Sequence, residues 1–347
     1  MKKKIIWKTI VTASAAITLM GTAPTVLNQI QAAQTEQTDS NTNTNSQSNN
    51  DKTLSSAYVV YGAGTSSEVR SQLNKIFGVD SSFKELTATA ADYNKYIANG
   101  TSDTTNAAMI SSVAIAPSDP GSGVKVNIKD YQGDNNITEV TAQQYAMVAQ
   151  MAGVTDVTIV VTANRPVSGE SALTGVYEAL AANGIQLNTQ NTASANQMLN
   201  ATQSAIDANK NNTKYPGQLM AAVGEVSKQI SQQKQQNNGQ DLATKQDIQA
   251  MLNKALAEHG IANETTNNQK DQITNALINF QNSPISADKS YTKNVDNTIQ
   301  NVKNSTGNLM NKAKNWMNSK QGQAAAQEAK NWFERFIDWI KSLFGWN

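Results

Sequence analysis

The sequence predicts an α+β protein, in which an N-terminal mixed-sheet α/β sandwich domain at residues 57–185 is followed by an all-α region at residues 186–347. Short apolar runs of β type alternate with segments of helical periodicity in the first region. The second region contains almost no strand signal. The order of helix, strand and helix across residues 141–183 favours helices packed against a sheet.

Each element of the first region is predicted from its period and its flanking turn residues. We expect strands at residues 58–61, 83–89, 109–116, 124–128 and 156–163. We expect helices at residues 68–77, 92–97, 141–152 and 170–182. The run Ser-Asp-Pro-Gly-Ser-Gly at residues 118–123 predicts a hairpin between the third and fourth strands, which makes the sheet mixed.

Two glycines support the helix assignments. Gly153 is expected to end the helix that Thr141 begins, with Val154 folding back as the apolar partner of a Schellman turn. Gly175 is expected to let the helix at residues 170–182 lie close to the sheet.

In the second region, apolar residues recur at steps of three and four, which predicts helices. The three clearest runs are Leu219, Val223, Val226, Ile230; Ile248, Leu252, Leu256; and Ile273, Leu277, Phe280. From Val295 to Trp316 the steps approach a heptad seam with Thr306 in its middle. We expect these helices to pack on one another or on the first domain.

The N-terminus has the pattern of a secretory signal peptide at residues 1–33. Lysines at positions 2, 3, 4 and 8 precede an apolar stretch, and Ala32–Ala33 offers a cleavage site. The alternative is a retained membrane anchor, but the apolar stretch is about half of the ~20 residues that a spanning helix needs. We therefore expect a secreted, extracellular protein that is associated with the cell envelope. Residues 34–56 are polar and should form a disordered leader.

Composition excludes several kinds of chemistry. The chain has no Cys and one His, which excludes disulfides, a cysteine nucleophile, iron–sulfur clusters and multi-histidine metal sites. We expect no cofactor and no metal. Without residues 1–33, 24 basic residues face 27 acidic ones, so the net charge is −3 and no nucleic-acid partner is expected.

The segment Gly62-Ala-Gly64 follows a strand and precedes a helix, as in a dinucleotide-binding fingerprint. Ser67 stands where the third glycine should be. We favour a structural interpretation, in which Thr65 and Glu68 form a capping box.

The turn from Asn164 to Ser171 joins a strand to a helix and is the candidate site for a small anionic ligand. Its candidate residues are Arg165, Ser168, Gly169 and Ser171, because a guanidinium, hydroxyls and free amides at a helix start bind anions. Glu170 opposes such binding. The favoured alternative is structural, with Ser168 as the N-cap of the helix.

His259 precedes Gly260 at a predicted helix end, where it can interact with the last carbonyls. A catalytic histidine would need a nucleophile on a strained turn, and the chain contains no G-x-S-x-G sequence. We therefore expect no catalytic residues in a His-based triad.

The C-terminus carries a stripe of large apolar side chains at helical spacing. Its members are Trp332, Phe333, Phe336, Trp339, Ile340, Leu343 and Phe344. Because residues 310–347 have a net charge of +3, this stripe suits an amphipathic helix on an anionic membrane surface. The alternatives are docking in the protein's own core or in the groove of a protein partner; Glu334 and Asp338 favour the internal site.

The segment GVTDVTIVVTANRPVSGESALTGVYEAL, at residues 153–180, follows ISSVAIAP and GSGVKVNI. This sequence resembles the YpuA-like secreted proteins of Gram-positive bacteria, which are classed as a domain of unknown function (DUF1002). The resemblance covers residues 57–185 and implies export, but it implies no activity and no catalytic residues.

These observations predict an exported, cell-envelope-associated protein that acts by binding rather than by catalysis. One alternative is a secreted hydrolase that uses carboxylates in a cleft of the α/β domain. Another is a membrane-surface factor that acts through its C-terminal helix.

Overall fold

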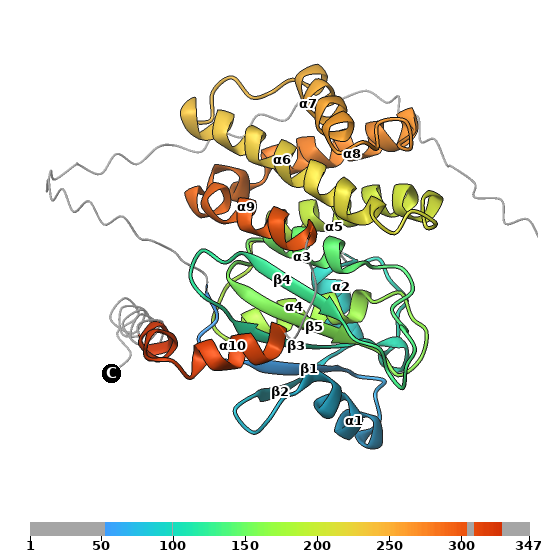
Figure 1. Ribbon diagram of the computed structural model, residues 1–347, viewed down its shortest axis with the longest axis vertical. Coiled ribbons are helices and arrows are strands. Elements are labelled where there is room, and N and C mark those ends of the chain that lie inside the picture. Colours follow the sequence, from blue (N-terminus) through green and yellow to red (C-terminus); the bar gives the residue numbers. More distant parts are fainter. Residues whose placement is uncertain (1–52, 99, 304–308, 328–347) are drawn as a thin grey trace, which may run out of the picture. The chain divides into compact units, whose positions relative to one another are not determined.

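The computed structural model describes residues 53–98, 100–303 and 309–327. All of these residues belong to one compact unit. Within it, helices cover both faces of a five-stranded sheet and a further layer of helices lies beyond α3 (Figure 1). The predicted α+β class is confirmed.

The strands lie close to their expected positions: β1 (Tyr58–Gly62), β2 (Lys84–Ala88), β3 (Ser112–Pro117), β4 (Val124–Ile128) and β5 (Val157–Thr162). The helices against the faces of the sheet are α1 (Ser67–Phe77), α3 (Ala142–Met151), α4 (Glu170–Ala182) and α10 (Leu309–Met317), and α2 (Ala90–Tyr96) packs on α4. The remaining helices are α5 (Thr189–Ala208), α6 (Tyr215–Gln236), α7 (Lys245–Glu258), α8 (Asn267–Asn282) and α9 (Lys289–Lys303). Short 3-10 turns occur at η1 (Asn106–Ala108) and η2 (Pro284–Ala287).

The sheet is mixed, but it contains no hairpin between β3 and β4. The strand order is β2-β1-β3-β5-β4, so the predicted hairpin is wrong. β5 lies between the two strands, antiparallel to β3 and parallel to β4. All six residues of β5 are buried, whereas β4 is partly exposed. A strand that is buried on both faces belongs in the interior of a sheet, which is why β5 separates the other two.

The residues expected to close the hairpin wrap around the start of β5 instead. Ser118 N–H donates to the Asp156 carbonyl at 2.8 Å, and Gly123 N–H donates to Asp156 Oδ1 at 2.9 Å. Asp156 therefore fixes both ends of this loop.

One face of the sheet packs against α3 and α4. Its buried side chains are Tyr58, Val60, Val113, Ile115, Val157, Ile159 and Val161. The predicted role of Gly175 is confirmed, because a Cβ at this position would lie 2.8 Å from Val113 Cγ1 and 3.1 Å from Val60 Cβ. The predicted Schellman turn after α3 is also present, with Val154 N–H donating to the Ala149 carbonyl.

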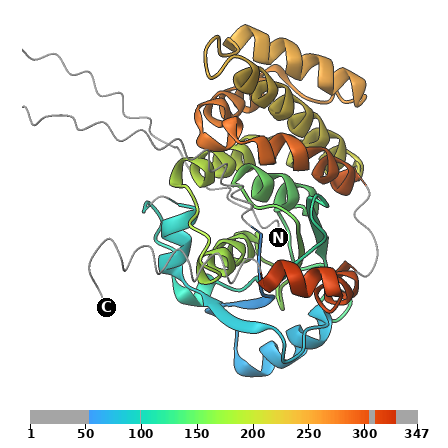
Figure 2. The same cartoon turned by 90° about the vertical axis from the view of Figure 1, so that its left-hand side faces the viewer.

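The other face carries smaller side chains and is covered by α1 and α10 (Figure 2). Leu73 and Phe77 of α1 and Met310 and Ala313 of α10 pack here. The side chains of the sheet on this face are Val59, Tyr61, Ala114, Ala116 and Val160. An ion pair also holds α10, since Lys314 Nζ lies 2.5 Å from Asp80 Oδ2. This contact, together with hydrogen bonds from Ser82, lowers the pKa of Asp80 to about 2.

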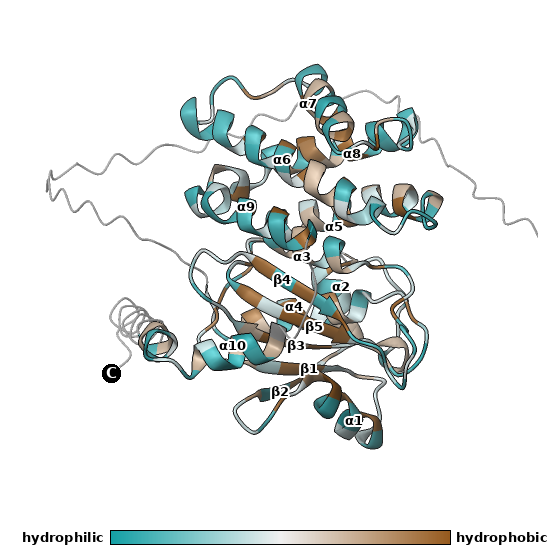
Figure 3. Ribbon diagram, viewed as in Figure 1, coloured by the Kyte–Doolittle hydropathy of each residue, from teal (hydrophilic) through white to brown (hydrophobic). Residues whose placement is uncertain are grey.

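The predicted apolar seams of α6, α7 and α8 are confirmed, since their members are buried. α6 contacts α3, α7, α8 and α9 and is the central helix of the outer layer. Hydrophilic residues are frequent on these helices, whereas the strands are mostly hydrophobic (Figure 3).

The predicted continuous seam from Val295 to Trp316 is wrong. α9 and α10 are separate helices that pack on different elements, α9 on α6 and α3, and α10 on β5 and β3. Val295, Ile299 and Val302 of α9 belong to one core cluster, whereas Met310 and Ala313 of α10 belong to another. The seam therefore comprises two independent packing faces that happen to follow one another in register.

The polar leader predicted for residues 34–56 extends too far. Leu54 is 4% exposed, and Ser55 donates from its backbone N–H and its hydroxyl to Asn183 Oδ1. These residues belong to the folded unit. Residues 1–52, with the predicted signal peptide and the rest of the leader, lie outside the described residues.

Side chains of α9 cover the edge of the sheet at β4. Val124 N–H donates to Thr298 Oγ1 at 2.9 Å, and Thr298 Oγ1 donates to Gln150 Oε1 at 2.8 Å. Asn301 Nδ2 donates to the Val124 carbonyl at 3.1 Å. α9 thus satisfies backbone groups that would be unpaired on a bare edge strand.

We expect Thr298→Val to lower the free energy of unfolding by about 1–3 kcal/mol, because the isosteric change leaves Val124 N–H and Gln150 Oε1 buried without partners. Urea unfolding followed by circular dichroism measures this change. Thr292→Val on the same helix is the control and should cost less than about 0.5 kcal/mol. Equal stability of both variants would contradict the role given to Thr298.

Candidate functional site

The carboxyl ends of four strands meet at one edge of the sheet. β1, β2, β4 and β5 all run in the same direction, and β3 runs against them. The loop after β1 and the turn after β5 therefore lie at the same edge, together with the N-terminus of α4. Open α/β sheets bind their ligands at this edge, which makes it the first candidate for a site.

The loop after β1 has a structural role for both of its glycines. A Cβ at Gly62 would lie 2.3 Å from the Met109 carbonyl oxygen, and one at Gly64 would lie 2.5 Å from that of Ala107. Backbone of residues 107–110 therefore packs directly against both glycines, which accounts for the absence of side chains there. The predicted capping box is wrong, since Ser66 is the N-cap of α1 and the Thr65 hydroxyl donates to the Ile110 carbonyl.

The turn after β5 brings the four candidate residues together but gives them different surroundings. Arg165 is exposed, and its Nη2 donates to the Ala107 carbonyl at 3.3 Å. Ser171 is 8% exposed and shares a hydrogen bond of 2.6 Å with Ser111 Oγ. Ser168 is not the N-cap of α4; Gly169 takes this place with a φ of 111°.

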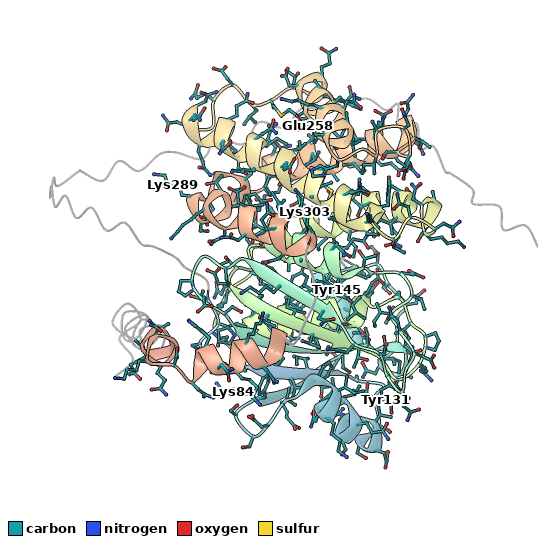
Figure 4. The ribbon with its side chains drawn as sticks, viewed as in Figure 1. Lys84, Tyr131, Tyr145, Glu258, Lys289 and Lys303 are labelled. Carbon is teal, nitrogen blue, oxygen red and sulfur yellow. The ribbon has the colours of Figure 1, made fainter. Side chains whose placement is uncertain are left out.

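The backbone carbonyl of Gly169 also accepts a hydrogen bond from a helix that covers the sheet. Tyr145 of α3, labelled in Figure 4, donates its hydroxyl hydrogen to the Gly169 carbonyl. Gly169 and Ser171 therefore build the turn, and Arg165 is the member of the set that is open to solvent.

A glutamate lies beside the candidate anion site. Glu170 is the first residue of α4, and its Oε2 accepts a hydrogen bond of 2.9 Å from the Tyr93 hydroxyl. Burial and the neighbouring carboxylate raise the pKa of Tyr93, so this phenol stays protonated. The Glu170 charge thus faces the start of α4, and a ligand anion would have to bind through Arg165 rather than through the helix amides.

A second group of titratable side chains lies where α2 packs on α4. Burial and the nearby Asp92 carboxylate raise the pKa of Glu178 above its ordinary value. Lys95 Nζ donates to the Tyr96 hydroxyl at 2.8 Å, and the Tyr96 ring packs on Tyr177. Asp92 also closes the capping box of α2 with Thr89. Two carboxyl groups with different environments are the arrangement that acid–base chemistry requires.

His259 is the C-cap of α7, as its position before Gly260 predicts. Its Nε2 lies 3.0 Å from Glu225 Oε1, within ion-pair distance although without hydrogen-bond geometry. Its carbonyl accepts a hydrogen bond from Gln218. These contacts tie α7 to α6.

Sequence reasoning missed a half-open depression of about 320 Å³ between α7 and α8. It is lined by Gln249, Leu252, Asn253, Asn267, Lys270, Asp271 and Thr274. Because amide residues are frequent along the whole chain, the amides that line this depression do not stand out in the sequence. The signal that could have found it is the polar face at positions 267, 270, 271 and 274 beside the buried seam of α8.

Other parts of the predicted site contribute no geometry. The apolar stripe at residues 332–344 lies outside the described residues. Across residues 53–98, 100–303 and 309–327, no three His, Asp or Glu side chains are grouped to hold a metal ion. In the same ranges, no helix combines the length and the apolar character needed to cross a membrane.

We expect Glu178→Gln to change how stability depends on pH. The raised pKa means that the folded state holds the Glu178 proton more tightly than the unfolded state does, so the wild type loses stability as pH rises above 4.5. The neutral amide should remove this loss, so the advantage of Glu178→Gln should grow between pH 4.5 and neutrality.

Thermal unfolding at a series of pH values measures the difference. Glu139→Gln, at an exposed position outside the cluster, is the control. A constant difference between Glu178→Gln and the wild type across this range would refute the assignment.

Comparison of the sequence with known protein families identifies the family of this chain. The chain matches the family described as "Protein of unknown function (DUF1002)" over residues 61–302, from β1 to α9. No curated protein and no solved structure matches the chain. Because the family match covers well over half of the sequence, the protein belongs to the DUF1002 family.

Proposed function

We propose that this protein is an exported, cell-envelope-associated binding protein, and that Arg165 makes its main contact with an anionic envelope component. The N-terminal pattern of residues 1–33 supports export. The resemblance to YpuA-like proteins of Gram-positive bacteria supports the same location.

The observation that supports the binding role is that Arg165 is exposed and that only part of its guanidinium is hydrogen-bonded within the protein. Three arginines occur in the chain against 25 lysines, and Arg165 is an exposed one at the carboxyl edge of the sheet. One of its donors is bonded, to the Ala107 carbonyl. This bond orients the guanidinium, and its remaining donors suit a carboxylate or a phosphate.

Export has a direct test. The chain recovered from the medium or from the envelope fraction should begin near Ala33 or Gln34, because the small residues there fit a signal-peptidase site. N-terminal sequencing identifies the first residue. A chain that starts at Met1 in these fractions would contradict export by cleavage.

We expect Arg165→Ala to reduce binding to purified cell walls that retain their anionic polymers by about ten- to hundredfold, as expected for the loss of a charge-assisted hydrogen bond of ~1.5–3 kcal/mol. Arg165→Lys should bind at an intermediate level, because it keeps the charge but loses the planar set of donors. Co-sedimentation measures the bound fraction.

Lys210→Ala removes an exposed positive charge from the helical layer and is the matched control. Walls stripped of anionic polymers serve as the ligand control. Unchanged binding by Arg165→Ala would remove the basis for assigning this contact.

A second candidate function is hydrolysis by the carboxyl groups of Asp92 and Glu178. The observation that favours it is the raised pKa of Glu178 beside a second carboxylate. The same wall preparations distinguish the two functions. Soluble fragments released by the wild type and lost in Asp92→Asn and Glu178→Gln would favour the hydrolase.

A further inference from the structure

We propose that the chain from α10 onward forms a second binding surface, and that its ligand is the surface of an anionic phospholipid bilayer. This C-terminal surface comprises Lys312, Trp316 and Lys320, which the structure describes, and the apolar stripe at residues 332–344, which lies outside the described residues. It does not include Arg165. The inference goes beyond the proposed function, and each can fail without the other.

The fold holds one side of α10 against the sheet and leaves the other side open. Met310 and Ala313 are buried, and α10 contacts β3 and β5. Lys314 pairs with Asp80, which fixes the helix in place. α10 lies along the strands, away from α6, α7 and α8 (Figure 1). Lys312 is exposed on the other side of the helix, and that side can face a partner.

The described part of the C-terminal surface is positively charged. Residues 309–327 contain three lysines and no Asp or Glu, so their net charge is +3. Of these lysines, Lys314 is already paired with Asp80, whereas Lys312 and Lys320 are exposed. Each lysine close to an anionic bilayer strengthens binding about fivefold. We therefore expect Lys312 and Lys320 to contact the lipid headgroups.

Tryptophan is concentrated in the same part of the chain. Of the five tryptophans, four lie here, Trp316 among the described residues and Trp332, Trp339 and Trp346 beyond them. Trp316 is partly exposed and belongs to neither core cluster. Tryptophan is enriched where a membrane meets water, whereas lysine is depleted in protein–protein interfaces. The combination of tryptophan with exposed lysines therefore favours a bilayer over the groove of a protein partner.

The described fold offers little apolar surface that could cover the stripe at residues 332–344. Among the described residues, one large apolar side chain is exposed, Leu242 at 40%, in the loop between α6 and α7. The stripe contains seven large apolar side chains. Soluble proteins rarely leave a continuous apolar patch of this kind in water. A cover from outside the fold, which a bilayer provides, is therefore favoured over docking in the protein's own core.

The charges within the stripe segment also suit a bilayer surface. At about 3.6 residues per turn, the sequence predicts that Arg335 and Lys341 flank the two edges of the apolar stripe. The same spacing predicts that Asp338 lies in the middle of the polar face, with Glu334 near it. Basic side chains at the edges can extend to the headgroups, while the carboxylates point to water. Glu334 and Asp338 are therefore compatible with a membrane surface.

Vesicle binding by the chain that lacks residues 1–33 tests the proposal. Because Trp7 is absent from this form, all four of its tryptophans report on the C-terminal part of the chain. We expect the protein to co-sediment with vesicles that contain phosphatidylglycerol, and its tryptophan emission to shift to shorter wavelength. Binding to vesicles of phosphatidylcholine alone should be at least tenfold weaker, because these vesicles carry no net charge.

Ile340→Asp and Ser342→Asp form a matched pair that tests the stripe. Each variant adds one carboxylate, the first in the middle of the apolar stripe and the second on the polar face. Ile340→Asp should bind phosphatidylglycerol vesicles at least tenfold more weakly than Ser342→Asp does. Neither variant should change the melting temperature in the absence of lipid, because the stripe is not part of the protein's own core.

The double variant Lys312→Gln, Lys320→Gln tests the described part of the surface. Loss of two charges near the bilayer should weaken binding about thirtyfold. The matched control is the double variant Lys210→Gln, Lys254→Gln, which removes two exposed ammoniums from the helical layer and should bind as the wild type does. Arg165→Ala should also bind vesicles as the wild type does, so the two binding roles are tested separately.

The proposal is overturned if the wild type does not bind phosphatidylglycerol vesicles, if both kinds of vesicle bind equally, or if Ile340→Asp binds as tightly as Ser342→Asp. Equal binding by the two double lysine variants would also contradict it. A lower melting temperature of Ile340→Asp without lipid would have the same consequence, because it would show that protein already covers the stripe.

Discussion

Burial of β5 on both faces is the constraint on which the rest of the structure depends. Its six residues, Val157–Thr162, have no exposed side. Such a strand needs a neighbour on each edge and a layer on each face. β3 and β4 supply the edges. α3 and α4 cover one face, and α1 and α10 cover the other, so elements from both ends of the described chain are needed to enclose this strand.

The helical layer follows from the edge of this sheet. β4 is the last strand beside β5, and α9 lies along it with Thr298 and Asn301 bonded to its backbone. α9 in turn packs on α6, to which α7 and α8 are joined. The two regions that composition separates at residue 185 are therefore parts of one compact unit, because the helices satisfy backbone groups that the sheet leaves unpaired.

Local signals in the sequence predicted individual elements well and their neighbours poorly. Gly153, Gly175 and the apolar steps of α6 act within one turn or one face, so their roles could be inferred from spacing alone. The order of the strands depends on which strand is buried on both faces, and the turn at residues 118–123 carries no information about an inserted β5. The steps from Val295 to Trp316 likewise kept a regular period although α9 and α10 face different partners. Periodicity predicts a buried face but does not identify what covers it.

The two candidate regions could be predicted from the sequence to different degrees. The turn after β5 is contiguous in sequence, so Arg165, Ser168, Gly169 and Ser171 could be grouped from their positions in the chain, although the burial of Ser171 against Ser111 could not be inferred in this way. The depression at α7 and α8 joins residues that lie on two helices, in a chain with 41 Asn and 30 Gln. An amide becomes informative when its bonding is known. Asn301 donates to the backbone of β4, and Asn183 accepts hydrogen bonds from Ser55 and Tyr58. Asn253 and Asn267, in contrast, line an open depression. The division between amides that complete the fold and amides that stay exposed to solvent is therefore a property of tertiary structure, because the sequence around the two kinds of amide is similar.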